Sequence, residues 1–426
     1  MLPGLYINVV GQGPTPPPSG SRGIVGLPIA LPWLADHEII EVWPRDVAAL
    51  VTRLGVAALA IQEAAKNASK LLIYRLNTGT KAAGTLGNLT ATAKYGGTYG
   101  NKLTVSIENV VGEPGAFHVI TWAEGREVNR QKVTDASGLV ANEWVVFSHT
   151  VATLATNAGR ALTGGTDGSV TTQDYADALT ALETANFTAA ACLSDDASIK
   201  ALFIAFARRL RGEGRYVQVV VPDTANADYE GVISVKNGVV LDGGVAVSKV
   251  VAAAYIAGAT AGCPLTASLT SSPYLGAVDV DARFTVQQQE DMARQGHLVF
   301  VPSFDGENKV VIQKDINSLT TFTLERPYSF SKNKIIRTVD DVAAYIVAIG
   351  HARFVGKVPN NQNGRDMFKA AILEYLQSLG DNVLRDVVPE DIMVSPGTLI
   401  DSSEVTYALR PVDTMDVIYN TIVVSG

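Results

Sequence analysis

The sequence is poor in the residues that build covalent or metal-bound frameworks. Among its 426 residues only two are cysteines, Cys192 and Cys263, and they lie far apart without CxxC spacing. This pattern excludes a disulfide framework and a zinc site with the usual ligand spacing. Cysteine scarcity is compatible with a reducing compartment.

Positive charge is also in short supply. The chain carries 34 Lys and Arg against 42 Asp and Glu, a formal net charge of −8. A protein that coats nucleic acid needs a basic surface to neutralise phosphates, so we expect no nucleic-acid partner. Charged residues make up 18% of the chain and hydrophobic residues 47%, which is typical of a globular protein. A chain of this length has room for about two to four domains.

No long hydrophobic run is present. The most apolar internal stretch, residues 250–259, is too short and too rich in alanine to span a bilayer. It predicts a buried helix and no membrane insertion. No basic residue precedes Arg22, and Pro3 and Gly4 interrupt any early apolar run. We therefore expect no secretion signal and a protein made in the cytoplasm.

Motifs of catalysis and cofactor binding are missing as well. HExxH, G-x-S-x-G and P-loop patterns do not occur, and the five histidines are scattered. The glycine-rich stretch 164–168 could offer amides to an anion, but a turn at a domain boundary is the simpler interpretation. The pairs Asp195–Asp196 and Asp279 with Asp281 are better explained as helix caps than as metal ligands. We expect no catalytic residue, no cofactor, no metal and no enzymatic activity, although a triad of distant residues would leave no motif.

What the chain does have is strand-forming sequence at both ends. Residues 417–424 show no helical period and no capping residues, and residues 5–10 have the same character. Unpaired strand edges recruit other chains, so we expect both ends to bind another chain. Residues 11–21, rich in proline and glycine, form either a tether between subunits or a disordered tail. The residues expected in these two strand arms are Leu5, Tyr6, Ile7, Asn8, Val9, Val417, Ile418, Tyr419, Asn420, Thr421, Ile422 and Val423.

Changes in periodicity along the chain predict an α/β multidomain protein. Short, partly alternating segments separated by turns indicate an all-β sandwich inserted after a β-α-β opening. The expected strands of this sandwich are residues 89–93, 103–107, 117–123, 126–133 and 144–147. Alternating helices and strands then predict a three-layer α/β domain with a largely parallel sheet, and a compact α+β domain follows. The expected divisions are 1–22 (arm and linker), 23–86 (α/β segment packing with the core domains), 87–160 (β-sandwich), 161–325 (three-layer α/β domain), 326–415 (α+β domain) and 416–426 (arm strand).

One window of the sequence has an excess of positive charge. Between residues 332 and 369 seven basic residues stand against three acidic ones, whereas the whole chain has a charge of −8. Such an excess indicates either an ordinary solvated face or a basic surface that docks on an acidic protein partner. The basic residues are Lys332, Lys334, Arg337, Arg353, Lys357, Arg365 and Lys369.

A family resemblance extends along nearly the whole chain, carried by short segments in a fixed order. These segments are Pro3 to Asn8, Gly96 to Asn101, Leu162 to Gly168, Ala257 to Gly262, Asp315 to Thr321, Asn333 to Asp341, Gly356 to Asn361 with Gly364-Arg365, and Arg410 to Met415. With them the sequence resembles contractile phage tail sheath proteins, of the kind found in Gram-positive phages, defective prophages and phage-tail-like bacteriocins.

The resemblance implies a structural subunit of a virion or a phage-tail-like particle. It implies a helical polymer around the tail tube that is metastable when extended and contracts to drive the tube through the cell envelope. Further copies of the chain, the tail tube protein, and baseplate and tail terminator proteins are the implied partners. The middle domain is implied to be subtilisin-like in topology only, the terminal arms to add strands to neighbouring sheets, and the domain that holds the basic window to lie next to the tube.

Two alternatives remain open on the sequence alone. An α/β hydrolase or peptidase with a β-sandwich accessory domain would require a buried cluster of acid and base groups in a cleft. A surface-layer or adhesion protein would fit the acidity and the β content, but it would need a secretion signal.

Overall fold

The structure is a computed structural model that describes residues 22–224, 227–303 and 310–423. These residues divide into two compact units. One unit contains Val339–Val412, and the other contains Arg22–Thr338 together with the segment that begins at Asp413. The expected arm at residues 5–9 and the linker at 11–21 lie outside the described residues.

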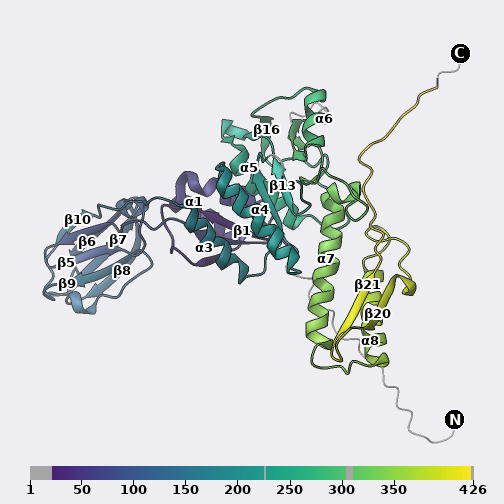
Figure 1. The fold of residues 1–426 in the computed structure, drawn as a ribbon. Coiled ribbons are helices and arrows are strands. Elements are labelled where there is room, and N and C mark those ends of the chain that lie inside the picture. Colours follow the sequence, from purple (N-terminus) through teal and green to yellow (C-terminus); the bar gives the residue numbers. More distant parts are fainter. Residues whose placement is uncertain (1–21, 225–226, 304–309, 424–426) are drawn as a thin grey trace, which may run out of the picture. The chain divides into compact units, whose positions relative to one another are not determined.

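A seven-stranded sheet forms the centre of the larger unit (Figure 1). Its strand order is β17-β13-β12-β11-β1-β3-β2, and every pair of neighbours is parallel except β3 and β2. The early part of the chain and the part after the sandwich therefore share one sheet. Its strands are β1 (Ile24–Ile29), β2 (Ile39–Val42), β3 (Lys70–Arg75), β11 (Ala189–Ala191), β12 (Gln218–Pro222), β13 (Val232–Val235) and β17 (His297–Leu298).

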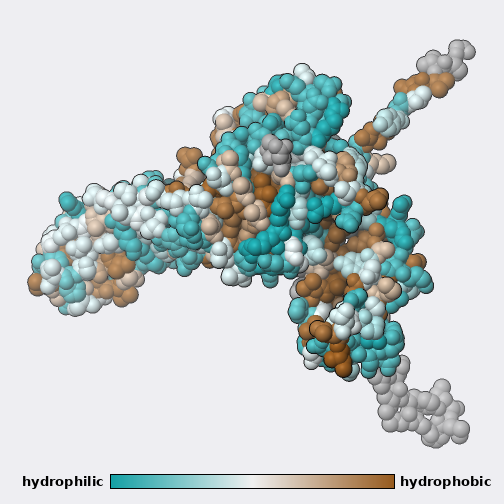
Figure 2. Space-filling model, in the orientation of Figure 1, coloured by the Kyte–Doolittle hydropathy of each residue, from teal (hydrophilic) through white to brown (hydrophobic). Residues whose placement is uncertain are grey.

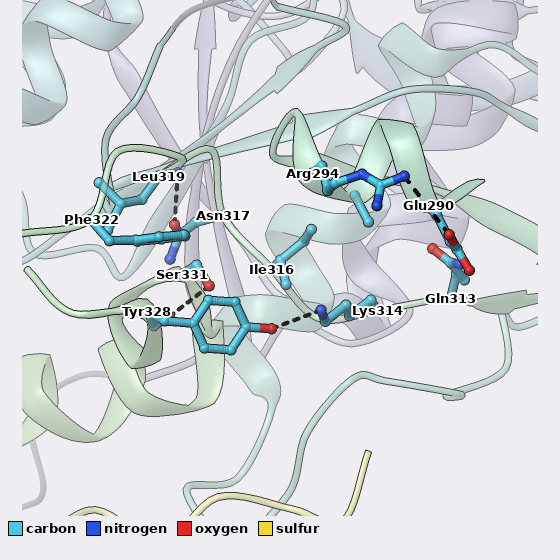
Figure 3. A pocket seen from close by; sticks show the side chains of 11 residues that line it. Glu290, Arg294, Gln313, Lys314, Ile316, Asn317, Leu319, Phe322, Tyr328 and Ser331 are labelled. Carbon is cyan, nitrogen blue, oxygen red and sulfur yellow. Dashed lines mark hydrogen bonds and ion pairs between the residues drawn. The ribbon is translucent and has the colours of Figure 1, made fainter. Parts of the chain in front are cut away.

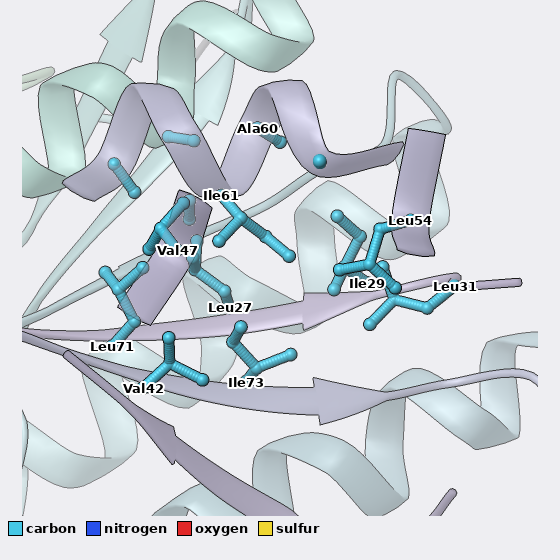
Figure 4. Close-up of a cluster of buried hydrophobic side chains, with 14 of the residues drawn as sticks. Leu27, Ile29, Leu31, Val42, Val47, Leu54, Ala60, Ile61, Leu71 and Ile73 are labelled. Carbon is cyan, nitrogen blue, oxygen red and sulfur yellow. The ribbon is translucent and has the colours of Figure 1, made fainter. Parts of the chain in front are cut away.

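Helices lie on both faces of this sheet, which explains why the central strand β1 is buried along its whole length. Alternate residues of β1 enter different cores: Val25 and Leu27 pack with α2 and α5, and Ile24 packs with α3 and α4. Figure 4 shows part of the first core. The helices of this unit are α1 (Val47–Leu54), α2 (Ala58–Ala65), α3 (Thr172–Glu183), α4 (Ala197–Gly212), α5 (Lys249–Gly262) and α6 (Val286–Arg294).

Two of these helices, α2 and α5, approach each other so closely that only glycine fits at the contact. A Cβ atom added at Gly258 would lie 2.2 Å from the Ala64 carbonyl oxygen, and one at Gly262 would lie 2.0 Å from the Asn67 carbonyl oxygen. This contact gives a physical reason for the small residues at 257–262. It also places the apolar helix α5 in the core rather than in a membrane.

The segment Pro44–Ala65 is long and apolar enough, by length and composition, to cross a membrane, with a mean hydropathy of 1.5. It is not one continuous helix, because Gly55 adopts φ 57° and separates α1 from α2. Ala58, Ile61 and Ala64 of α2 are buried in the core of the unit. These contacts are those of a core helix.

The sandwich consists of two antiparallel sheets that share one apolar core. One sheet has the order β4-β5-β9 and the other has the order β10-β6-β7-β8. Its first strand begins at Ala83, before the expected domain start at 87. The strands are β4 (Ala83–Leu86), β5 (Leu89–Ala93), β9 (Val145–His149), β10 (Asn157–Ala161), β6 (Leu103–Asn109), β7 (Phe117–Ala123) and β8 (Arg126–Val133).

Glycines line the junction where the chain enters and leaves the sandwich. A Cβ atom added at Gly97 would lie 1.9 Å from the Pro32 carbonyl oxygen, and one at Gly168 would lie 2.1 Å from that of Thr78. The Asn101 side chain exchanges hydrogen bonds of 2.8 and 2.9 Å with the backbone of Gly165. The glycine-rich stretch 164–168 is therefore part of a tight backbone junction.

Aromatic rings reinforce the same junction from the core side. Trp33, which follows β1, packs against Tyr99 and Trp144 of the sandwich with ring centroids 5.4 and 6.2 Å apart. The guanidinium of Arg53 on α1 lies 4.2 Å from the Trp144 ring centroid. Because these contacts join residues from both sides, the sandwich and the large sheet share one continuous core.

Smaller elements complete the larger unit. β14 (Val239–Leu241) pairs with β15 (Ala246–Val247) and β16 (Ala277–Val280), and β18 (Phe300–Pro302) pairs with β19 (Val310–Ile312). Short 3-10 helices of this unit are η1 (Pro44–Asp46), η2 (Gly55–Ala57), η3 (Thr98–Lys102), η4 (Ala136–Gly138), η5 (Asp242–Gly244) and η6 (Tyr328–Ser331). A further one, η8 (Pro389–Asp391), belongs to the unit that contains Val339–Val412.

The unit that contains Val339–Val412 has a simpler construction. The division between the units falls within α7 (Asn333–Ile349), which continues into a π-helical turn at Gly350–Phe354. Helix α8 (Gln362–Ser378) packs on β20 (Ile392–Pro396), which pairs in antiparallel fashion with β21 (Ser403–Tyr407). The expected domain boundaries at 326 and 416 differ from this division.

Candidate assembly site

One hollow among the described residues lies beside α6 and the segment 313–331. It has a volume of 360 Å³ and lies in the larger unit. Figure 3 shows Lys314 donating a 3.0 Å hydrogen bond to the Tyr328 hydroxyl at its edge, and Arg294 reaching Glu290 at 3.8 Å. No histidine or cysteine is among its lining residues. Its one serine, Ser331, donates its hydroxyl to the Tyr328 carbonyl oxygen at 2.7 Å rather than to a base.

A serine does contact a histidine elsewhere, but both are closed to solvent. The Ser234 hydroxyl lies 2.9 Å from Nδ1 of His297, and the two residues are 0% and 4% exposed. The same hydroxyl also donates to the Thr224 carbonyl oxygen at 3.3 Å. Burial lowers the pKa of His297 below its ordinary value. This pair stabilises the end of the sheet and offers no access to a substrate.

The carboxylates considered as metal ligands have other roles. Asp196 caps α4 by accepting hydrogen bonds from the Ser198 and Ile199 amides, as its position predicts. Asp279 pairs with Arg283 at 2.9 Å, and Asp195 pairs with Lys200 at 2.8 Å. Across residues 22–224, 227–303 and 310–423, no group of three or more His, Cys, Asp or Glu residues is arranged to hold a metal ion.

The C-terminal segment, which is expected to form a strand arm, is exposed. From Val417 to Val423 every residue is exposed, with Tyr419 at 94% and Ile422 at 80%. Figure 2 shows hydrophobic side chains along this segment, which is yellow in Figure 1. The segment forms no strand within the single chain. Its apolar side chains and backbone groups are therefore accessible to another molecule.

Residues 413–416, which precede this segment, are held by contacts within the chain, in contrast to the exposed residues that follow them. The ammonium group of Lys332 pairs with Oδ2 of Asp413 at 3.1 Å and with Oδ2 of Asp416. The Thr414 hydroxyl donates to the second oxygen of Asp416 at 2.9 Å. Burial alone would lower the pKa of Lys332, but the hydrogen bonds from its ammonium to the two carboxylates raise it. The ammonium group of Lys332 therefore keeps its positive charge.

A second buried ion pair supports the base of α7. The Arg337 guanidinium lies 2.8 Å from Oδ2 of Asp315, and both side chains are almost fully buried. Burial would raise the pKa of Asp315, but Arg337 and the hydrogen bonds from Leu269 and Asn333 lower it. Breaking a buried pair of this kind typically costs about 3–5 kcal/mol, so the pair belongs to the core.

These contacts correct the expected basic surface. Lys332, Lys334 and Arg337 are 9%, 2% and 4% exposed, and two of them are ion-paired to aspartates of the chain. They are therefore not part of a docking face. The remaining candidates are partly or fully exposed: Arg353, Lys357, Arg365 and Lys369.

The segment Gly356–Asn361 precedes α8 in the chain and contacts both α8 and the β20–β21 hairpin. Asn361 caps α8 by accepting a 2.9 Å hydrogen bond from the Gly364 amide. Asn360 donates to the carbonyl oxygens of Ile400 and Ser402 at 3.0 and 2.8 Å, which fixes the hairpin loop. A sequence motif can indicate a cap, but the bond between Asn360 and a loop forty positions later was not predictable from it.

The β20–β21 sheet has two unpaired edges. Among the described residues β20 and β21 pair only with each other. One face is covered by α8, and Met393 on β20 is 60% exposed. A two-stranded sheet with open edges is marginal by itself and accepts further strands readily.

Family comparisons agree with these structural features. The models for the phage tail sheath protein central domain, the phage tail sheath protein β-sandwich domain and the phage tail sheath C-terminal domain match residues 168–318, 77–167 and 325–425. The first two models meet between Asp167 and Gly168, within the glycine junction.

Relatives of similar length extend the match to nearly the whole chain. The phage-like element PBSX protein XkdK of Bacillus subtilis is 34% identical over 98% of this chain and 96% of its own. The sheath tail protein of Desulfitobacterium hafniense is 39% identical, with a TM-score of 0.84 over 96% of this chain and 100% of its own. That of Listeria innocua is 32% identical, with a TM-score of 0.81 over 93% of both chains.

The family and these neighbours are structural sheath proteins and not enzymes, which confirms the prediction of a non-enzymatic protein and disfavours the hydrolase alternative. The chain shares its multidomain fold, including the β-sandwich, with these sheath tail proteins along nearly its whole length. The chain belongs to the phage tail sheath protein family.

Proposed function

We propose that this protein polymerises helically around a tail tube and that strands are exchanged between its copies. The observation that carries this proposal is the segment Val417–Val423, which is exposed, free of charged residues and without a strand partner in the single chain. An exposed strand-forming segment gains backbone hydrogen bonds when it joins a sheet edge of another molecule. A contact between different surfaces of identical copies generates an open helix when its rotation does not close into a ring.

The acceptor in this proposal is the β20–β21 sheet. Its edges are open, and α8 packs on one face and holds its strands in a defined orientation. The segment Val417–Val423 has β-branched residues at five of its seven positions, which favours strand geometry. The arm at residues 5–9 is proposed to act in the same way.

We infer that the extended polymer is metastable and contracts to drive the tube through a target envelope. Strand pairing preserves connections between copies while the bodies of the subunits rearrange, because backbone hydrogen bonds need not break. In this proposal the protein acts in a virion or a phage-tail-like particle, with tail tube, baseplate and terminator proteins as partners. The domain around the parallel sheet is proposed to have a three-layer, subtilisin-like topology, supported by the helices on both of its faces.

Removal of the arm tests the proposal. Deleting residues 417–426 is expected to leave a folded monomer, since the described part of the segment is exposed, and to abolish tubes in electron micrographs. Thr421→Pro is a subtler variant, because proline removes an amide donor that strand pairing uses. Thr421→Ala is its matched control and should assemble normally. Tubes of normal length from the deletion variant would overturn strand exchange.

A further inference from the structure

The segment Arg410–Asp416 fastens the chain in both compact units. In the first unit, Arg410 forms two hydrogen bonds of 2.7 Å with the carboxylate of Asp391, and the Val412 amide donates to the Val383 carbonyl oxygen at 2.9 Å. In the second unit, Asp413 and Asp416 pair with Lys332. The chain is therefore fixed on each side of the point at which it passes from one unit to the other.

Lys332 is well placed to act as the fixed side of this fastening. It follows the 3-10 helix Tyr328–Ser331, and its amide donates to the Ser329 carbonyl oxygen at 3.1 Å. Its own carbonyl oxygen accepts the Ile336 amide at 3.1 Å, in the first turn of α7. The next residue, Asn333, is tied to Asp315 by a 2.9 Å side-chain hydrogen bond. The backbone around Lys332 is thus anchored independently of the C-terminal segment.

Exposure becomes continuous just beyond the fastening, although Met415 within it is already 88% exposed. The Asp416 side chain is 10% exposed, whereas Val417 is 67% and Ile418 77% exposed. The boundary between held and free chain therefore lies between Asp416 and Val417. We propose that Lys332, through Asp413 and Asp416, is a positioning residue that sets the origin of the arm offered to a second copy of this chain.

This inference rests on the proposed strand exchange, and it gives a reason why the position at which the arm is held affects assembly. A tethered strand finds its partner at an effective concentration that falls as the tether lengthens. We call the contacts of Lys332 with Asp413 and Asp416 the clamp. Without the clamp, the chain would be held only up to Val412, so residues 413–416 would join the free tether. On tether length alone, the concentration needed for assembly should then rise about two- to fourfold.

The test opens the clamp from either side. Lys332→Met removes the ammonium group, and the double variant Asp413→Asn with Asp416→Asn removes the two carboxylates. Lys200→Met is a matched control, because Lys200 is also 9% exposed and paired with an aspartate but does not contact the C-terminal segment. All variants are made in the full chain, and their thermal unfolding shows which of them fold.

The first measurement is made on monomers and does not depend on assembly. Cys192 and Cys263 are buried, so a nitroxide can be attached selectively to a cysteine introduced at Val417 or at Thr421. We expect the label at position 417 to become more mobile in both clamp variants but not in the Lys200→Met control. The label at position 421 should be mobile in every protein. Unchanged mobility at 417 in both clamp variants would show that no clamp exists.

The second measurement is the protein concentration at which tubes form. Both clamp variants are expected to need about two- to fourfold more protein than the wild type or the Lys200→Met control. If the deletion of 417–426 still forms tubes, the proposed function fails. If that deletion abolishes tubes while the clamp variants assemble at the wild-type concentration, strand exchange stands and only the positioning role of Lys332 is overturned.

Discussion

At the scale of single residues, ionisable side chains of this protein bind chain segments to each other rather than to a ligand. Asp228 illustrates this, since its carboxylate accepts hydrogen bonds of 2.8 Å from the amides of both Thr320 and Thr321. Burial would raise its pKa, but hydrogen bonds from Thr321 and Thr320 lower it from its ordinary value of 3.8 to about 2. The charge of Asp228 therefore stabilises the folded chain.

This shift predicts a pH-dependent contribution to stability. Because the folded pKa lies below the unfolded one, the contribution is present above pH 3.8 and disappears as the pH falls towards 2. Asp228→Asn should lower the free energy of unfolding by about 1–2 kcal/mol at pH 6 and by much less at pH 2.5. Urea denaturation at the two pH values measures the difference. Asp386→Asn is a suitable control, since Asp386 also has a positive φ; an equal loss for Asp228→Asn at both pH values would contradict the prediction.

The basic window shows where residue-level prediction from sequence ends. Local charge counts treat each lysine as a surface group, and this holds for Lys357, which is exposed. For Lys332 the partner carboxylates lie more than eighty positions later in the chain. No local pattern contains that information, because the pairing arises from the tertiary fold.

At the scale of elements, segments with apolar alternation were predictable and segments without it were not. The expected strands at 89–93, 117–123 and 126–133 coincide with β5, β7 and β8, because alternation and turn residues define them. The sequence analysis missed β10, whose residues Asn157–Ala161 are mostly exposed and lack apolar alternation. Such a strand is specified by its neighbour β6 rather than by its own residues.

Close helix packing leads to a prediction for α5. Gly258→Ala should destabilise the protein by about 2–4 kcal/mol, because the new methyl group would lie 2.2 Å from the Ala64 carbonyl oxygen and force α2 and α5 apart. Gly212→Ala at the end of α4 is the matched control, since no atom lies within 4 Å of the added Cβ. The control should be neutral or slightly stabilising. Chemical denaturation compares the two, and similar effects would argue against close packing as the reason for glycine at position 258.

At the scale of the whole molecule, the sequence resemblance captured what local patterns could not. Composition and missing motifs argued against an enzyme, and the family match confirmed a sheath protein. The shared sheet of β1, β3, β11 and β12 was not evident from sequence, because the sandwich separates its two halves by more than a hundred residues. Which residues of the assembled particle touch the tube stays a prediction.

That prediction has a direct test in the exposed basic residues. Lys357→Glu combined with Arg365→Glu should weaken assembly templated on tail tubes more than assembly of the protein alone, because a tube contact would meet repulsion. Lys81→Glu combined with Arg126→Glu makes the same change in net charge at exposed positions of the other unit. Sedimentation with and without tubes separates the two kinds of assembly. Equal weakening of both by the first pair would count against a tube contact.

The sandwich also has a practical consequence. Between β6 and β7 the chain turns through Val111, which is 99% exposed, and through Gly112 and Gly115, at which an added Cβ would meet no atom within 4 Å. A foreign peptide inserted in this loop would lie on an exposed turn of the sandwich and be repeated in every copy of the proposed polymer, as vaccine carriers and multivalent display platforms require.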